Sequence, residues 1–394
     1  KRLLVAKEPT NTWESATATW NSFPGYIYSY NGLPDKNNWT VKPEGADYEY
    51  LYQMARFSAW GSVDTEYWLT QDDTYAYKAQ RIVEDYITDV GNWKSTSLYF
   101  AYDPDGIRGG FPRSIDTSFK NNAFGQFALD ELLKSPYATP DYCTALLKNI
   151  WDTAHYLSVY HTADATNWRQ YEFQSLLNTS VFVPEFTDSL AGDNWREMGS
   201  KVLEETLFTN TLPDGSYIEG TGGYNVSAFG QFKSHKKFMY QNDAPVSAEY
   251  DKLLHLSAYY NALLYNADGS SLQYGDESRS TRSATTFTEV ANWYNDTELE
   301  YIVTFGASGT KPDWTSRHFP DSAVTAMRAD WSADSPYLFT NVRGGGGHSH
   351  SDDNAVIVSA YGRLLLNDAG IFTYGDDAYR QWAVSSRAHN TVVI

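Results

Sequence analysis

The chain has 394 residues, of which 42% are hydrophobic, so it can build a large core and is ordinary for a folded globular protein. Its formal net charge of −19 disfavours binding to nucleic acids or to anionic membrane surfaces. Cys143 is the single cysteine, which excludes an internal disulfide, and no apolar run approaches the roughly 20 residues that span a bilayer.

Residues 46–318 form a first large block that reads as helices joined by polar loops. Within it, Thr139 followed by Pro140 is typical of a helix N-cap with proline at the first helical position. The apolar residues behind this pair share the spacing of a buried helix face: Cys143, Leu146, Leu147, Ile150, Trp151, Ala154 and Leu157. Further helices are expected at 46–60, 74–88, 119–134, 195–208 and 225–240 and from about residue 246. Residues 1–45 show no recognisable pattern and are expected to form an N-terminal extension.

The pattern changes near residue 320, where short segments of alternating polarity predict strands. These segments are 323–329, 337–342, 355–360 and 363–366. Tyr361 and Gly362 look like the turn between the last two. A run of helices followed by a run of strands predicts an α+β protein, with 319–394 as the start of a separate antiparallel β domain. Because Thr391–Ile394 looks like mid-strand, we expect the polypeptide to continue beyond it or to be completed by another chain.

Two features of the composition leave alternatives open. The aromatic content of 16% fits either a large helical core or exposed rings that stack on sugars. An acidic substrate would need a local basic cleft on this acidic chain. Lys233, His235, Lys236 and Lys237 could supply one, or they could form a solvated helix face.

The most informative segment is Gly344–Asp353, in which four glycines precede His348 and His350 and two acids follow them. In extended backbone, residues two apart point to the same face, so these imidazoles are expected side by side. The glycines allow a ligand to approach the backbone closely. His350, Asp368 and His389 make a set of two imidazoles and one carboxylate, typical of Zn²⁺ or Mn²⁺ ligation, while His348 can exchange protons near neutrality.

Two earlier positions offer further chemistry. The amide of Asn167 can hydrogen-bond a carboxylate on which negative charge is building. Tyr224 follows a glycine-rich turn that could present its hydroxyl at a cleft, although a phenol, with an ordinary pKa of about 10, needs tuning to act as acid or base. Each residue taken alone fits a structural role better than a catalytic one.

Together these motifs resemble the heparinase II/III-like polysaccharide lyases, a superfamily that also contains alginate lyases. The resemblance is strong over about 340–394 and patchier over 100–330. Its β-domain signature is similar to Gly347–His350, Tyr361–Leu365, Asp368–Gly370 and Ala388–Thr391. Asp214–Tyr224 looks like the segment that carries the family's catalytic tyrosine, and Asn167 falls where the family places a carboxylate-neutralising asparagine.

The resemblance implies an (α/α) toroid followed by an antiparallel β-sandwich, in a protein that is secreted or periplasmic. It implies β-elimination on an acidic, uronate-containing polysaccharide, with alginate as first choice and a glycosaminoglycan or glucuronan next. Asn167 would neutralise the C5 carboxylate, Tyr224 or His348 would remove the C5 proton, and Tyr224 would protonate O4. The product would carry a 4,5-unsaturated uronate.

The resemblance also implies one divalent metal with a structural role, held by His350, Asp368 and His389. Zn²⁺ is the expected ion, with Mn²⁺ or Ca²⁺ as alternatives. One departure from the family pattern is Trp168, where many relatives carry a histidine beside the asparagine. It favours same-face elimination with Tyr224 as both base and acid. The candidate substrate contacts, each with a structural role as its alternative, are Arg113, Trp168, Arg169 and Glu172.

Three other functions remain open from the sequence. The first is a metal-dependent hydrolase that uses the His348/His350 motif, although Asp353 stands where metallo-β-lactamases would have histidine. The second is a toroid glycoside hydrolase with paired carboxylates, for which Asp276 with Glu277 or Glu172 could be nominated. The third is a sugar-binding module that has lost its chemistry.

Overall fold

The structure is a computed structural model in which two compact units are distinguished, Lys1–Leu203 and Glu204–Ile394. It describes residues 20–22, 26–28, 44, 49–57, 67–90, 113–125, 134–163, 166–186, 194–281, 284–342, 348, 350–375 and 377–392. The glycine run 344–347 and the last two residues, on which the sequence analysis drew, lie outside the described residues.

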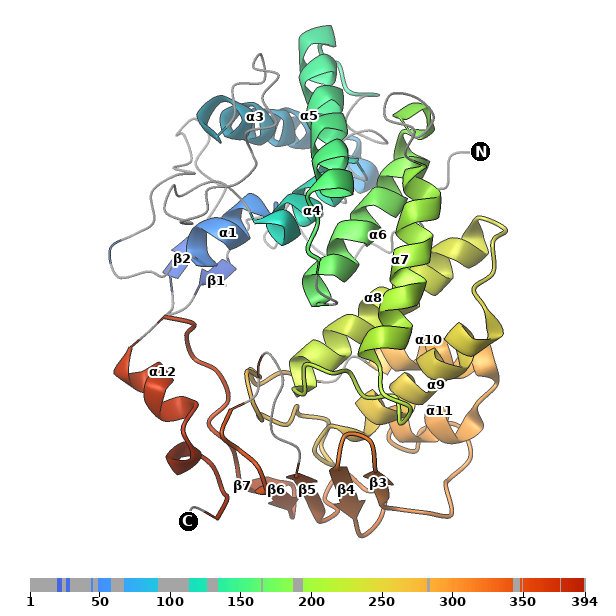
Figure 1. Cartoon of the computed structure of the whole chain (residues 1–394), viewed down its shortest axis with the longest axis vertical. Helices are drawn as coiled ribbons and strands as arrows, with labels where there is room; N and C mark the ends of the chain where they lie inside the picture. Colours follow the sequence, from blue (N-terminus) through green and yellow to red (C-terminus); the bar gives the residue numbers. More distant parts are fainter. Residues whose placement is uncertain are drawn as a thin grey trace. The chain divides into compact units, whose positions relative to one another are not determined.

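The first unit is mostly helical where it is described (Figure 1). Its helices are α1 (Glu49–Ala55), α3 (Asp73–Val90), α4 (Ser114–Ala123), α5 (Pro140–Val159), α6 (Asn167–Phe182) and α7 (Trp195–Asn210), the last of which continues into the second unit. It also contains the short pair of strands β1 (Trp20–Ser22) and β2 (Tyr26–Tyr28) and the 3₁₀ turn η3 (Pro184–Phe186).

Helix α5 forms as the sequence predicts. The Thr139 side chain accepts a hydrogen bond from the backbone N–H of Tyr142 at 3.2 Å, and Pro140 is the first helical residue. Four residues of the predicted apolar face are fully buried: Leu146, Ile150, Ala154 and Leu157. Cys143, expected in the core, is only half-buried. The apolar face therefore positions α5, and the thiol lies at its margin.

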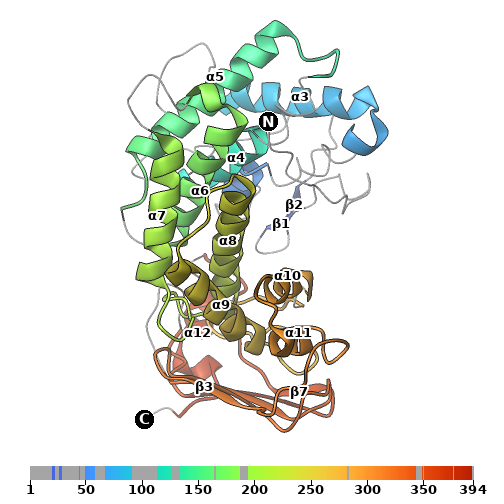
Figure 2. The same cartoon turned by 90° about the vertical axis from the view of Figure 1, so that its right-hand side faces the viewer.

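The second unit packs helices against a sheet. Its helices are α8 (Gly222–Gln241), α9 (Ala248–Leu263), α10 (Ala284–Tyr294), α11 (Thr297–Val303) and α12 (Ala378–Ala383), with the 3₁₀ turn η4 (Ser386–Ala388). The strands are β3 (Arg317–Phe319), β4 (Val324–Arg328), β5 (Tyr337–Asn341), β6 (Ala355–Ala360) and β7 (Arg363–Leu366). They form one antiparallel sheet in chain order, and α9 and α11 cover one of its faces (Figure 2).

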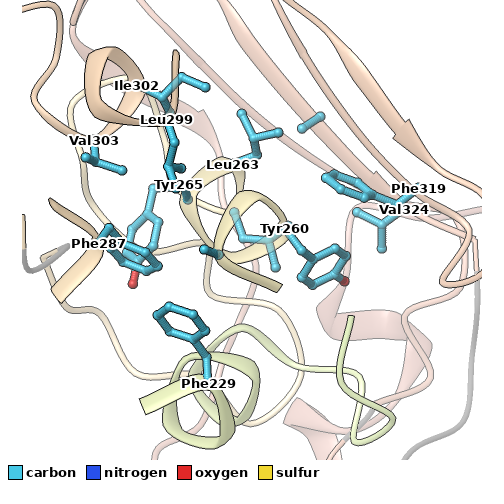
Figure 3. Packing of buried hydrophobic residues seen from close by; sticks show 14 of the residues in the cluster. Phe229, Tyr260, Leu263, Tyr265, Phe287, Leu299, Ile302, Val303, Phe319 and Val324 are labelled. Carbon is cyan, nitrogen blue, oxygen red and sulfur yellow. The ribbon is translucent and has the colours of Figure 1, made fainter. Parts of the chain in front are cut away.

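Buried and more exposed residues alternate along the strands, so one face of the sheet packs against the helices. On β5, Tyr337 and Phe339 are buried while Leu338 between them is partly exposed. Figure 3 shows the resulting core, in which residues of the sheet meet residues of α8, α9, α10 and α11. Its labelled members are Phe229, Tyr260, Leu263, Tyr265, Phe287, Leu299, Ile302, Val303, Phe319 and Val324. The helices and the sheet of this unit therefore share one hydrophobic core.

The predicted order of helices followed by an antiparallel sheet is confirmed. The expected turn at Tyr361 and Gly362 is present, with φ of 56° and 64°, which suits a tight two-residue hairpin. The sequence did not predict α6, α10, α11, α12, β3 or the strand pair β1 and β2. Among the described residues, no helix is both long and apolar enough to cross a membrane.

Candidate active site and metal centre

Tyr224 is the third residue of α8, at the end of the turn that the sequence placed before it. Its ring stacks on that of His348, with centroids 3.6 Å apart and an angle of 10° between the planes. Its hydroxyl is 2.8 Å from the hydroxyl of Tyr374. The structure therefore brings together, from distant segments of the chain, the phenol and the imidazole that the sequence singled out.

A third residue, Asp276, holds the imidazoles in place. Its carboxylate is 3.0 Å from Nδ1 of His348 and 2.8 Å from Nε2 of His350, and it forms an ion pair with Arg380. Burial alone would raise the pKa of Asp276, but the hydrogen bonds from these three partners outweigh it and lower that pKa well below its usual range. The Asp276 side chain is 1% exposed, so a fixed negative charge lies beneath both histidines.

The expected metal ligands also converge. His350, Asp368 and His389 are all buried, and one potential ligand atom from each lies within 4.8 Å of the others. Nδ1 of His350 and Nε2 of His389 are buried without a hydrogen-bond partner, as expected of nitrogens that face a cation. The carboxylate of Asp368 accepts a hydrogen bond from Nδ1 of His389 at 2.8 Å. This donor set could hold a metal ion.

Asp352 adds a further acid to this buried cluster. Burial and the nearby Asp368 carboxylate both raise its pKa, and one of its oxygens has no hydrogen-bond partner. Burial would lower the pKa of His389, but the two carboxylates raise it instead. Two acids and two imidazoles enclosed in one place are stabilised by a positive charge.

Glu277, next to Asp276, serves the start of α8. Its carboxylate accepts a hydrogen bond from the backbone N–H of Gly223, and a Cβ on Gly223 would lie 2.3 Å from its Oε2. This contact explains the glycine immediately before Tyr224. Burial raises the pKa of Glu277 to about 8, despite the opposing hydrogen bond. At neutral pH the side chain is therefore mostly protonated.

The other predicted site residues lie in the first unit, Lys1–Leu203. Asn167 is the first residue of α6 and is buried. The guanidinium of Arg113 pairs with Asp116 at 2.9 Å and lies over the ring of Trp168, 5.2 Å from its centroid. Arg169 donates a hydrogen bond to the carbonyl of Ala163 at 2.8 Å.

Glu172 differs from its neighbours. It is fully buried, and its carboxylate accepts hydrogen bonds of 2.8 and 2.7 Å from the backbone N–H and the hydroxyl of Thr162. This arrangement fixes the loop before α6. A carboxylate buried in this way is engaged within the protein, which favours a structural role for Glu172 over a substrate contact.

The basic run on α8 does not form an open cationic cleft. Lys233 and Lys237 both pair with Glu289, and Lys236 pairs with Asp251. His235 is fully buried, and burial lowers its pKa to about 4. The nomination of Asp276 and Glu277 as paired glycosidase acids is weakened as well, because one holds the histidines and the other the start of α8.

The sequence did not predict the roles of three residues that contact the site, which are Asp276, Tyr374 and Arg380. Asp276 was noticed only as one acid of a possible pair. No spacing rule connects it to His348, because the two residues are 72 positions apart and meet only through a tertiary contact between loops. The preceding Gly275, at φ +59°, is the one local signal, since it marks a turn that needs glycine.

Known proteins resemble this chain in sequence and in fold. The family model described as Heparinase II/III N-terminus matches residues 5–301, and Heparinase II/III-like, C-terminal, matches 311–394. A heparin-sulfate lyase of Bacteroides stercoris is 23% identical, over 100% of this chain and 61% of that protein.

Solved structures resemble this one in fold. A mutant heparan sulfate lyase of Pedobacter heparinus has a TM-score of 0.68 at 22% identity, covering 98% of this chain and 60% of the other. A crystal structure of heparinase III has a TM-score of 0.84 at 19% identity, with coverages of 98% and 63%. The chain thus spans about three-fifths of these relatives' length, and the solved structures share its fold.

Proposed function

Because the chain belongs to the heparinase II/III family, we propose that it carries the chemistry of a polysaccharide lyase that cleaves a uronate-containing polysaccharide by β-elimination. The observation that carries this proposal is the stacking of Tyr224 on His348 at 3.6 Å. Elimination needs a base for a ring proton and an acid for the leaving oxygen, and an imidazole beside a phenol is suited to these two tasks.

The proposed substrate is a heparan-sulfate-type glycosaminoglycan. The relatives reported above are named for heparin or heparan sulfate, and the expectation of alginate as first choice finds no support among them. Glucuronan is the next choice, because its uronate carries the same C5 proton. The paired lysines of α8 give no separate preference for a heavily sulfated chain.

In the proposed reaction, a base removes the proton from C5 of the uronate, and the electrons of that bond form a C4–C5 double bond. The C4–O4 bond breaks, and Tyr224 gives its proton to O4. His348 is the proposed base, through the ring nitrogen that does not face Asp276. Tyr224 acting as both base and acid is the alternative for a substrate whose proton and leaving group lie on the same face.

Asn167 is the proposed group that hydrogen-bonds the uronate carboxylate and so makes the C5 proton more acidic. This role rests on the family resemblance, and the position of Asn167 at the first turn of α6 gives its amide a fixed backbone. Arg113, Trp168 and Arg169 are proposed substrate contacts on the same ground. An Asn167→Ala variant tests the first role through the fall in kcat that it should cause.

We propose that His350, Asp368 and His389 hold one divalent cation. Zn²⁺ is the first choice for two imidazoles and a carboxylate, with Mn²⁺ or Ca²⁺ as alternatives. When bound, the cation would neutralise the buried acids and would not touch the substrate. His350 lies after β5, Asp368 after β7 and His389 directly after η4. The cation would therefore tie together the loops beside His348.

We also propose a domain organisation, which rests on the family resemblance. Residues 46–318 would belong to an (α/α) toroid, residues 319–394 would begin an antiparallel β-sandwich, and residues 1–45 would precede both. A secreted or periplasmic location would give such an enzyme access to its polymer.

The test is an elimination assay on uronate polymers, read as the ultraviolet absorbance of the new double bond conjugated to the carboxylate. We expect absorbance to rise with heparan sulfate and the rise to be lost in His348→Ala. His318→Ala, at an exposed histidine on β3, is the control that should retain activity. Full activity of His348→Ala would remove the proposed base, and absence of product from every uronate polymer would remove the lyase.

A further inference from the structure

One carboxylate in this site faces two histidines through opposite ring nitrogens. Asp276 lies 3.0 Å from Nδ1 of His348 and 2.8 Å from Nε2 of His350. We propose that Asp276 is a positioning residue that sets both tautomers at once, placing the proton of His348 on Nδ1 and that of His350 on Nε2. This inference rests on the proposed function for the meaning of the His348 tautomer, but not for the tautomers themselves.

The chemistry of the contact decides where the protons are. An ionised carboxylate only accepts hydrogen bonds, so each ring nitrogen that faces it must donate. Arg380 also donates to the carboxylate, with one distance of 3.1 Å, and favours its ionised form. A neutral imidazole has one N–H, so the other nitrogen of each ring keeps a lone pair.

The two lone pairs then face different tasks. On His348 the lone pair is on Nε2, the atom that would accept the C5 proton. On His350 it is on Nδ1, which is buried and has no hydrogen-bond partner, as a metal-facing nitrogen should be. Asp276 thus gives neighbouring histidines opposite tautomers and, with them, separate roles.

The backbone around Asp276 holds this geometry. The N–H of Asp276 donates to the carbonyl of His348 at 3.0 Å, so the two residues are joined through main chain and side chain. Gly275 lets the segments come this close, because a Cβ there would lie 2.8 Å from the same carbonyl oxygen and 2.5 Å from Thr221. Tyr224 covers the other side of the His348 ring. The imidazole therefore has little freedom to turn away.

The tautomers can be measured directly by NMR on the chain with its histidines labelled with ¹⁵N. The chain has eight histidines, and the signal of His348 is the one lost in His348→Gln. We expect His348 to carry its proton on Nδ1 and His350 on Nε2. A His348 protonated on Nε2 alone would overturn the proposal, whatever the activity of any variant.

The second measurement uses Asp276→Asn. A carboxamide can donate as well as accept, so it no longer forces both rings to donate. We expect the His348 signal to shift toward the Nε2–H tautomer and kcat to fall by about 10- to 100-fold, with KM changed far less. An unchanged kcat in a folded variant would overturn the proposal.

Asp296→Asn is the matched control. Asp296 also accepts from a histidine, His255, at 2.8 Å, but it lies at the start of α11 and has no contact with His348 in the described structure. The same chemical change should leave kcat and the His348 tautomer as in the wild type. If no uronate polymer gives unsaturated product, the proposed function fails, while the NMR measurement still decides the tautomers.

Discussion

Tyr224 shows how a common residue becomes special through its neighbours. The chain has 31 tyrosines, and this one lies against His348 with its hydroxyl 2.8 Å from that of Tyr374. The stack keeps the planes of the phenol and the imidazole nearly parallel and in contact. In the proposed reaction, this pair would exchange protons with adjacent atoms of one bound sugar.

We expect Tyr224→Phe to lower kcat by about 100-fold or more, because the ring and its stacking remain while the proton donor is lost. The melting temperature should change little, since the lost hydrogen bond is at the surface. The comparison is Tyr240→Phe, at a tyrosine that is 77% exposed on the last turn of the same helix and should be neutral. Near-normal turnover of Tyr224→Phe would exclude the tyrosine as the acid.

His350 has a different task, in spite of standing two residues from His348. Its side chain is buried, and its ring is held by Asp276 on one side and faces the other candidate ligands with Nδ1. We expect His350→Ala to lower both metal content and melting temperature, because it removes a ligand and leaves buried acids without compensation. Elemental analysis and thermal unfolding measure the two effects. A variant that retains the metal of the wild type would end the metal assignment.

At the scale of elements, the start of α8 depends on a side chain from outside the helix. Thr221 is its N-cap residue but makes no capping hydrogen bond with its side chain, and Glu277 accepts from Gly223 instead. The segment of Asp276 and Glu277 therefore supports His348 with one carboxyl group and the turn before Tyr224 with the other. The relative position of the two proposed catalytic groups is set by these neighbouring residues.

The raised pKa of Glu277, from about 4.5 to about 8 through burial, predicts a dependence of stability on pH. Between these values the unfolded chain releases a proton that the folded chain retains, so this group lowers stability as pH rises through the window. Glu277→Gln has no proton to lose and keeps an acceptor for Gly223. We expect the free energy of unfolding of this variant, relative to wild type, to grow by about 1–3 kcal/mol from pH 5 to pH 8. Chemical unfolding at several pH values measures it, and a difference independent of pH would contradict a buried neutral Glu277.

The sequence was informative where local rules decide structure. The capped start of α5 follows from Thr139 and Pro140, and strands β4 to β7 follow from alternation, each within about two residues. Helix α6 was missed because its buried residues are largely polar and surround it, so no apolar stripe marks one face. The metal ligands could be named from their types and spacing. The role of Asp276 could not, because it depends on a tertiary contact between loops.

At the scale of the molecule, a fold shared with heparinase III at a TM-score of 0.84 persists at 19% identity. Packing of helices on a sheet tolerates such divergence, since many apolar residues fill the same space, whereas the site needs particular atoms. The net charge of −19 makes long-range attraction of a polyanion unfavourable. Recognition of the proposed acidic polymer would therefore depend on short-range hydrogen bonds and ion pairs, as proposed for Asn167 and Arg169.

The most direct test of the lyase chemistry is mass spectrometry of the products released from heparan sulfate. Elimination leaves the new non-reducing end lighter by one water than hydrolysis would, because no water enters the cleaved bond. We predict that every non-reducing end newly formed by cleavage is unsaturated and that these products disappear in Tyr224→Phe. Saturated new non-reducing ends, with oxygen from labelled water in the new reducing ends, would contradict the account and identify a hydrolase instead.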